Sequence, residues 1–429
     1  MKQSNILKQV IPVVIGSSYN AYGIIRSFAQ EGISSVLVSA KKNFIQYSKY
    51  LVRHVTVTNV TENEDAFIDQ LIEMGKEMLP VRGMLFPTHD EQVTAIAKHA
   101  GDLAPYFEIP FSDLATCQKL MDKDSFAALC EKIGIPTIRG KLVNSVEELH
   151  NCVLELGFPI LIKPNITDDA LKEKMGEEKK VCTNETECDA YVSKYFMLYP
   201  ESSLLIQEYI PDSDREMPTV NCLTTRSGDA LCTFIGLKLR QYPPQKGTST
   251  AMRAADPRDQ EYQMLVRYTT KMLKAVGYYG LSGTEYKYDP RDGLYKIIES
   301  NARSEFPNYL QTLSGLNMSY QLYRYHLGEE PTIPFYPPKP TATCAVPFND
   351  WFFSCIYNKH VYPEYAITNK ERKATLTKPT SGYGLAADDW RAYLFTFAIS
   401  AWRAFNSFIR VKFHIPAEIR TIDYFLKRK

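Results

Sequence analysis

The chain has 429 residues, with 50 lysines and arginines against 49 aspartates and glutamates. This length exceeds what one ordinary hydrophobic core organises, so we expect two or three domains. The balanced charge argues against a dedicated nucleic-acid-binding protein, whose affinity needs a concentrated positive surface.

The first ~110 residues predict a small open α/β domain. The segment VIPVVIGS (10–17) is a short apolar strand that ends in a glycine turn, and we expect a helix over 21–30 and a second strand over 35–39. A helix over 64–78 and the strand GMLFPT (83–88) repeat the pattern. Repeats of this kind are typical of a parallel sheet.

The first turn, from Gly16 to Gly23, resembles a dinucleotide fingerprint only in part. Ser18 and Ala21 take the positions of its second and third glycines, and Ser39 ends the next strand where a ribose-binding acid is expected. We therefore expect an ordinary helix N-terminus, whose free amides can still hold a substrate carboxylate.

The middle of the chain predicts helices over 112–121 and 123–133, followed by strands FPILIKPN (158–165) and SLLIQEYI (203–210). The polar residues 165–181 are expected to form a mobile loop. We found no internal repeat.

Two hairpins come next. One is centred on Ser227 and Gly228 within 221–239, and a long helix is expected over 260–276. GTEYKYD (283–289) and GLYKIIESNA (293–302) then form a predicted antiparallel pair around a Pro-Arg-Asp-Gly turn.

Residues 330–340 are proline-rich and predict an extended strap into a C-terminal extension. The apolar stretch 392–402 is far shorter than the ~20 residues that a spanning helix needs. A helix packed on the body is favoured there over an aromatic and basic helix lying on a membrane.

The nine cysteines, from Cys117 to Cys355, contain no C-x-x-C pair. Their irregular spacing predicts reduced thiols, not disulfides or a zinc site. The N-terminus lacks the apolar core and cleavage site of a secretory signal, so we expect a cytoplasmic protein.

The sharpest feature is the run IIESNARSEF (297–306). Glu299, Asn301 and Arg303 occupy alternate positions and therefore share one face of a strand. A turn near Asp292 places Glu285 opposite Glu299, and two like charges facing each other are destabilising unless something positive lies between them. A divalent cation would satisfy this need, and so would a solvated face balanced by Lys287 and Arg303.

Two weaker features lie upstream. Lys163 ends a buried strand and needs an anionic partner, such as the α and β phosphates of a nucleotide. It could equally be a surface lysine at a strand end. Backbone groups of 207–210 could read an adenine edge, while the Glu208 carboxylate could take the ribose. His89, Asp90 and Glu91 could line the amino-acid or amine pocket, or Asp90 could be the N-cap of a helix.

In this order, DKDSFAALCEKIGIPT, FPILIKP, LLIQEYI, GTEYKYD and IIESNARS closely resemble the ATP-grasp superfamily of carboxylate–amine ligases, over about residues 10–330. The resemblance implies an α/β and α+β protein. Its expected domains are an N-terminal parallel α/β domain at 1–112, an ATP-grasp domain of two α+β lobes at 113–330 with a hinge near 207–211, and a partly helical extension at 331–429.

The resemblance also implies ATP with Mg²⁺ or Mn²⁺, and it implies roles for single residues. The nucleotide-binding residues would be Lys123, Lys163, Lys179, Glu208, Tyr209 and Ile210; the metal ligands Glu285, Glu299 and Asn301; the catalytic cations Arg303, Arg240 and Lys180. One departure is the loop over the phosphates, which is rich in glycine and serine in many relatives. Here residues 165–181 offer only Gly176.

Within the superfamily, IPVVIGSSYNAYGIIRSF and KKVCT are most similar to D-aspartate ligases of peptidoglycan cross-bridge synthesis. This implies that the β-carboxylate of D-aspartate is activated and joined to a lysine side chain of a cell-wall precursor. A ligase for another acid and amine, and a nucleotide-binding module without turnover, remain alternatives. The acceptor, the stereochemistry of the acid and the oligomeric state stay open.

Overall fold

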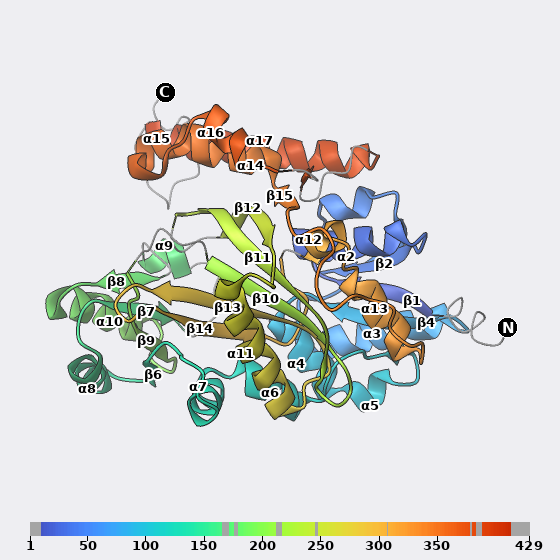
Figure 1. Ribbon diagram of the computed structural model, residues 1–429, viewed down its shortest axis with the longest axis horizontal. Coiled ribbons are helices and arrows are strands. Elements are labelled where there is room, and N and C mark those ends of the chain that lie inside the picture. Colours follow the sequence, from blue (N-terminus) through green and yellow to red (C-terminus); the bar gives the residue numbers. More distant parts are fainter. Residues whose placement is uncertain are drawn as a thin grey trace. The chain divides into compact units, whose positions relative to one another are not determined.

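The computed structural model describes residues 10–164, 171–175, 179–211, 217–244, 248–306, 308–377, 380–382 and 388–412 (Figure 1). The described parts of Met1–Asp122, Glu216–Tyr286 and Glu299–Phe405 form one compact unit, called unit 1. Those of Lys123–Arg215, Lys287–Ile298 and Asn406–Lys429 form unit 2. The units combine separate stretches of the chain, and the domain boundaries expected from the sequence stay a prediction.

Unit 1 contains the parallel sheet that the sequence predicts. Its five strands have the order β3-β2-β1-β4-β5, and every neighbouring pair is parallel. Their bounds are Val10–Ile15 for β1, Ser35–Ser39 for β2, Leu51–Thr56 for β3, Arg82–Pro87 for β4 and Phe107–Glu108 for β5. The sequence analysis missed β3, whose mixed, partly exposed residues lack a buried strand's apolar run.

Helices cover both faces of this sheet. Val13 and Ile15 pack with helices α3 (Glu64–Met78) and α4 (Asp90–Lys98) on one face. Val14 packs on the other with α2 (Tyr19–Gln30). Helices α12 (Asn308–Leu313) and α13 (Met318–His326) complete that second core. A sheet buried on both faces explains why its central strands are continuous apolar runs.

Unit 1 also contains most of a seven-stranded sheet of order β14-β13-β10-β11-β12-β15-β16. Its strands are Met217–Thr224 (β10), Ala230–Tyr242 (β11), Thr248–Ala255 (β12), Gly280–Asp289 (β13), Leu294–Asn301 (β14), Thr343–Ala345 (β15) and Thr380–Gly382 (β16). Helix α11 spans Gln260–Val276. Both predicted hairpins are present, and the ends of β13 and β14 next to their turn belong to unit 2.

Unit 2 has a four-stranded antiparallel sheet of order β6-β9-β7-β8. The strands are Gly140–Val143 (β6), Ile160–Pro164 (β7), Lys180–Cys182 (β8) and Leu204–Glu208 (β9); the helices are Lys123–Lys132 (α7), Val146–Leu156 (α8), Leu171–Met175 (α9) and Glu185–Leu198 (α10). The loop expected over 165–181 was wrong in part, because α9 and the start of β8 lie within it. Residues 165–170 and 176–178, including Gly176, lie outside the described residues.

The described residues of the C-terminal extension are mostly helical. The extension follows residues 330–340, which contain neither helix nor strand. Its helices are α14 (Pro347–Phe352), α15 (Asn358–Val361), α16 (Asn369–Ala374) and α17 (Trp390–Lys412). Shorter elements elsewhere are α5 (Ala100–Leu103), α6 (Leu114–Met121) and brief 3₁₀ and π turns. Among the described helices, none is both long and apolar enough to cross a membrane.

Candidate active site

Two adjacent strands of unit 1 carry the predicted metal ligands, Glu285 on β13 and Glu299 and Asn301 on β14. The hydroxyls of Thr284 and Ser300 lie 2.9 Å apart on the opposite face of the pair. Because side chains alternate along each strand, Glu285 and Glu299 are cross-strand neighbours, as the sequence predicts.

A lysine relieves the repulsion between these carboxylates. Lys238 Nζ on β11 lies 2.9 Å from Glu285, and both side chains are largely buried. Burial opposes the charged ammonium, but Glu285 and then Glu299 outweigh it and raise the pKa of Lys238. Lys238 thus supplies a balancing charge at this pair that the sequence analysis did not assign.

Glu305 is a third carboxylate at this site, and the sequence analysis missed it. Its side chain accepts a hydrogen bond from Asn301 Nδ2, while Oε2 is a buried oxygen without a partner among the described atoms. Burial, followed by the charges of Glu285 and Glu299, raises the pKa of Glu305 to about 8. Gly283 on β13 makes room for it, since a Cβ there would lie 2.1 Å from Oε2.

We call Glu285, Glu299, Glu305 and Asn301 the carboxylate cluster. A signal for Glu305 was present, because it extends the alternation of 299, 301 and 303 by one step. The strand itself ends at Asn301, so alternation alone no longer fixes a direction for residue 305.

Arg303 adjoins the carboxylate cluster. Its Nη2 donates to Asn301 Oδ1 at 3.2 Å, and its guanidinium forms a two-pronged pair with Asp90 through Nε at 2.7 Å and Nη2 at 3.1 Å. Burial disfavours the charge, yet Asp90, Glu305 and Glu299 raise the pKa of Arg303 overall. His89 is the N-cap of α4 and Asp90 its first residue, so the first sheet positions the arginine.

Two buried asparagines, Asn20 and Asn308, connect the first glycine turn to the segment that follows Arg303. Asn20 Nδ2 donates to the Ser304 carbonyl at 2.8 Å, and Asn308 Nδ2 donates to the Asn20 carbonyl at 2.8 Å. A Cβ on Gly23 would lie 1.8 Å from Asn308 Oδ1, so this close approach needs glycine. The carboxylate-binding role expected for the turn remains a prediction.

In unit 2, the Glu208 carboxylate is engaged in an ion-pair network. It is 3% exposed and accepts from the Arg139 amide at 3.1 Å, from Arg291 Nη2 at 3.0 Å and from Lys296 Nζ at 3.4 Å. Asp289 lies in the same network, 2.7 Å from Lys296. Burial alone would raise the pKa of Glu208, but these partners lower it overall.

This network predicts an acid-sensitive unit 2. Because the folded pKa of Glu208 is lowered, its stabilisation is complete above the unfolded pKa near 4.5 and is lost as the pH falls through the folded value. Denaturant titrations below pH 4.5 should therefore show a shallower loss of stability in Glu208→Gln than in the wild type, provided that the variant is folded at neutral pH. Parallel curves for the two proteins would contradict the coupling.

Tyr209 and Ile210 follow β9, and the predicted lysines of unit 2 lie on or next to other elements. Lys287 Nζ donates to the Ile210 carbonyl at 2.8 Å and lies 5.3 Å from the centre of the Tyr209 ring. Lys163 on β7 and Lys180 on β8 are half-buried, as is Lys179, which precedes β8. Lys123 begins α7, and its side chain lies outside the described residues. Their nucleotide roles stay predictions.

Arg240, the other predicted catalytic arginine, is held by a buried acid. Its Nε and Nη2 donate to Asp350 at 2.6 and 3.0 Å, and Arg372 donates to the same carboxylate at 3.0 Å. Asp350 is fully buried in α14, so this pair joins β11 to the C-terminal extension. A catalytic role for Arg240 is still a prediction.

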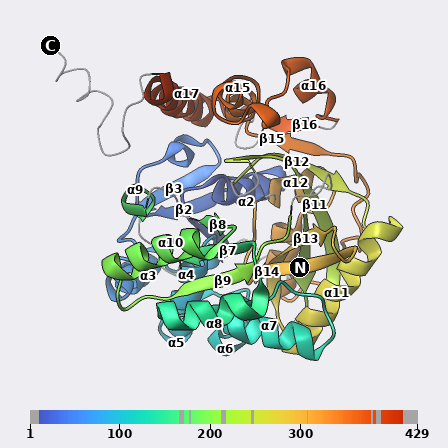
Figure 2. The ribbon, with the colours of Figure 1, turned by 90° about the vertical axis from the view of Figure 1, so that its left-hand side faces the viewer.

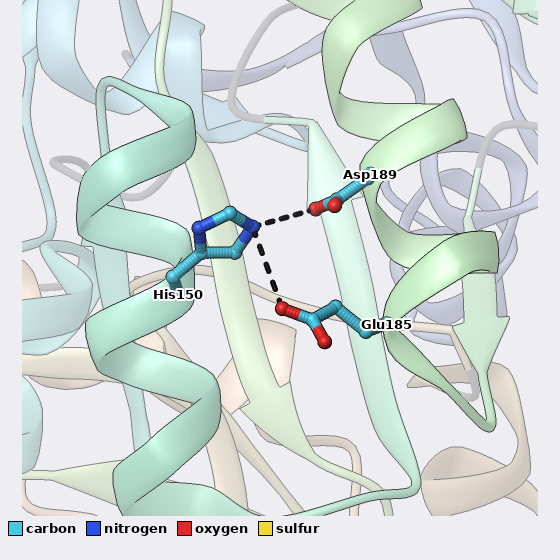
Figure 3. Close-up of side chains that lie close together, drawn as sticks. All are labelled: His150, Glu185 and Asp189. Carbon is cyan, nitrogen blue, oxygen red and sulfur yellow. Dashed lines mark hydrogen bonds and ion pairs between the residues drawn. The ribbon is translucent and has the colours of Figure 1, made fainter.

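A separate polar group, His150 on α8 with Glu185 and Asp189 on α10, lies in unit 2 (Figure 3). His150 Nε2 is 2.8 Å from Asp189 and 3.9 Å from Glu185, and all three side chains are well exposed. Exposed pairs of this kind contribute little stability. We assign them to the pairing of the two helices.

The chain is similar to known proteins in sequence. Residues 122–329 match the family described as "Carbamoyl-phosphate synthase L chain, ATP binding domain". The chain is 28% identical over 324 residues to a D-aspartate ligase of Enterococcus faecium, covering 73% of this chain and 75% of that one. These two matches bear out the predicted resemblance to ATP-grasp carboxylate–amine ligases, D-aspartate ligase in particular.

Solved ATP-grasp structures share the fold. A biotin carboxylase of Campylobacter jejuni matches with a TM-score of 0.60 at 15% identity, over 79% of this chain and 75% of that one. An L-amino acid ligase of Bacillus licheniformis matches with a TM-score of 0.58 at 18% identity, over 78% of each chain. These structures confirm the predicted fold class. The prediction of an ATP-grasp carboxylate–amine ligase is confirmed by the family match and the similarity to the D-aspartate ligase, taken together with them.

Proposed function

We propose that this ATP-grasp ligase activates the side-chain carboxylate of an acidic amino acid, D-aspartate, and joins it to an amine of a cell-wall precursor. The observation that carries the proposal is the carboxylate cluster with Arg303 beside it, in a chain similar over most of its length to a D-aspartate ligase. The similarity supports the choice of acid.

The chemistry explains the need for such a site. A carboxylate does not condense with an amine in water, because oxide would have to leave. Transfer of the γ-phosphoryl group from ATP to a carboxylate oxygen gives an acyl phosphate and ADP. The amine nitrogen then forms a bond to the acyl carbon, phosphate leaves, and the amine gives up a proton. The protein contributes placement and electrostatic stabilisation.

We assign roles to the residues of unit 1. Glu285, Glu299 and Asn301 would hold Mg²⁺ or Mn²⁺, which when bound offsets the negative charge of the phosphates. Their oxygens fit a hard cation, and beside them the buried Oε2 of Glu305 has no partner among the described atoms. Lys238 keeps Glu285 compensated, and Arg303, oriented by Asp90, would bind the transferred phosphoryl group.

In unit 2, we propose that the backbone at Tyr209 and Ile210 reads the adenine and that Lys163, Lys179 and Lys180 bind phosphates. The network around Glu208 favours a supporting role for its carboxylate over a direct contact with ribose, since three cationic side chains already engage it. Lys163→Ala should then raise the KM for ATP more than it lowers kcat.

The test of the function is ADP release and hydroxamate formation with Mg-ATP, hydroxylamine and a panel of L- and D-amino acids. Hydroxylamine traps an acyl phosphate without knowledge of the natural amine. We expect a hydroxamate with D-aspartate. A hydroxamate only with another acid would overturn the choice of substrate, and ATP binding without ADP release with any acid would overturn the ligase assignment.

Glu305 gives a sharper prediction about the site. Its carboxylate accepts from Asn301 Nδ2, which turns Asn301 Oδ1 toward Arg303. Glu305→Leu removes that acceptor at similar volume, and we expect kcat to fall about 10- to 100-fold, as for other residues that orient metal ligands. Glu305→Gln retains an acceptor oxygen and should recover much of the loss. Equal kcat values for the two variants would contradict an orienting role.

A further inference from the structure

Small and polar residues form the buried side of helix α17, which faces the rest of unit 1. Ala392, Thr396 and Ser400 recur every fourth residue, form one stripe, and are all buried. Thr396 Oγ1 donates to the Ala392 carbonyl at 2.8 Å, so this hydroxyl is satisfied within the helix.

Four large apolar side chains of α17 are exposed, although Phe395 of the same helix packs against Tyr47. The exposed fractions are 58% for Trp390, 54% for Leu394, 63% for Trp402 and 57% for Phe405. A helix that packs on a protein body normally buries such residues and exposes its polar ones. The arrangement is inverted here, and we call these four residues the outer face of α17.

Polar contacts before the helix fix this orientation. Asp389 is buried and accepts hydrogen bonds from Tyr22 OH at 2.6 Å, Ser48 Oγ at 2.5 Å and the Lys49 amide at 3.0 Å. Farther along, Phe397 packs against Phe348 of α14, with ring centres 5.2 Å apart. The rest of unit 1 thus contacts α17 at its start and along one side, while the four residues of the outer face are more than half exposed. Figure 2 shows the backbone of α17 among the other C-terminal helices.

The charge of α17 indicates which kind of surface could cover its outer face. From 390 to 412 the sequence carries four basic residues, Arg391, Arg403, Arg410 and Lys412, and no acidic one. A second copy of the same helix would bring like charges together. An anionic lipid surface complements them, and tryptophan and phenylalanine are the side chains that enter the boundary between headgroups and acyl chains.

We propose that α17 binds the surface of an anionic lipid bilayer, lying in its plane with the outer face inserted between headgroups. This inference goes beyond the proposed ligase reaction and does not depend on it. It reverses the preference expected from sequence, because the exposed side of α17 is the apolar one. No described helix is suited to cross the bilayer, so the association would be peripheral.

The test uses the full chain and vesicles of phosphatidylcholine, with or without phosphatidylglycerol. We expect cosedimentation with the anionic vesicles that weakens as salt rises. Two of the three tryptophans, Trp390 and Trp402, lie in the outer face, so their fluorescence should shift to the blue on binding.

A pair of double variants isolates the outer face. Leu394→Glu with Trp402→Glu should weaken vesicle binding by at least about tenfold, because it places two carboxylates where apolar groups insert. The matched control is Leu154→Glu with Met197→Glu, which changes two exposed apolar residues of unit 2 and should bind like the wild type.

Circular dichroism and ADP release establish that each variant is folded. Absence of wild-type binding to anionic vesicles, or equal loss in both double variants, would overturn the proposal. So would a dimer in sedimentation that the Leu394 and Trp402 changes dissociate while vesicles bind nothing, since the outer face would then join two copies of the chain.

Discussion

Glu299→Gln is expected to reduce ADP formation about 10²- to 10³-fold, because a metal-dependent site that loses one charged ligand loses several kcal/mol of transition-state stabilisation. The fold should persist, since Glu299 is an exposed residue at the end of β14 and glutamine has its shape. The measurement is kcat for ADP release at saturating Mg-ATP and acid substrate.

The control for this variant is Glu62→Gln, which changes an exposed glutamate of unit 1 outside the carboxylate cluster. Raising the concentration of Mg²⁺ or Mn²⁺ should restore part of the activity of Glu299→Gln if the defect is in metal affinity. Near-wild-type turnover at low metal concentration would contradict the assignment of Glu299 as a ligand.

Asp350→Ala should produce the largest loss of stability. It leaves two guanidinium groups, Arg240 and Arg372, each only 12% exposed, without their shared carboxylate. Removal of one partner from a buried ion pair costs about 3–5 kcal/mol. Urea denaturation, followed by circular dichroism, should give a free energy of unfolding lower by that amount.

Glu73→Ala is the matched comparison for Asp350→Ala. Glu73 pairs with Lys76 one turn away on the exposed side of α3, and loss of such a pair should leave the free energy of unfolding unchanged within error. Equal effects of the two substitutions would show that the Asp350 pair does not hold the extension to β11.

Much of the fold follows from local sequence. The apolar strands β1 and β4 and the glycine turn after β1 predict a parallel sheet, and the Pro-Arg-Asp-Gly turn sets the pairing of β13 with β14. The missed elements lack such patterns. Strand β3 mixes apolar and polar residues and is partly exposed, and β6 is only four residues long. Neither offers enough periodicity to identify.

The site residues were likewise predictable only where they lie close together in the sequence. Glu285, Glu299 and Asn301 lie on two strands joined by one short turn, so alternation was enough to bring them together. The partners of Arg303 and Arg240 are Asp90 and Asp350, which are 213 and 110 residues away along the chain. Nothing in the local sequence indicates contacts at that separation.

Each unit contains buried cysteines, and chemical modification of these cysteines can report how often the unit opens transiently. All nine are buried thiols, five in unit 1 and four in unit 2. Burial raises the pKa of Cys117 in unit 1 and Cys130 in unit 2 to about 12, so neither presents a reactive thiolate at neutral pH while folded. An alkylating reagent can modify each thiol only when its surroundings open. The rate of modification at each cysteine, measured by mass spectrometry, therefore reports how often that part of the structure opens.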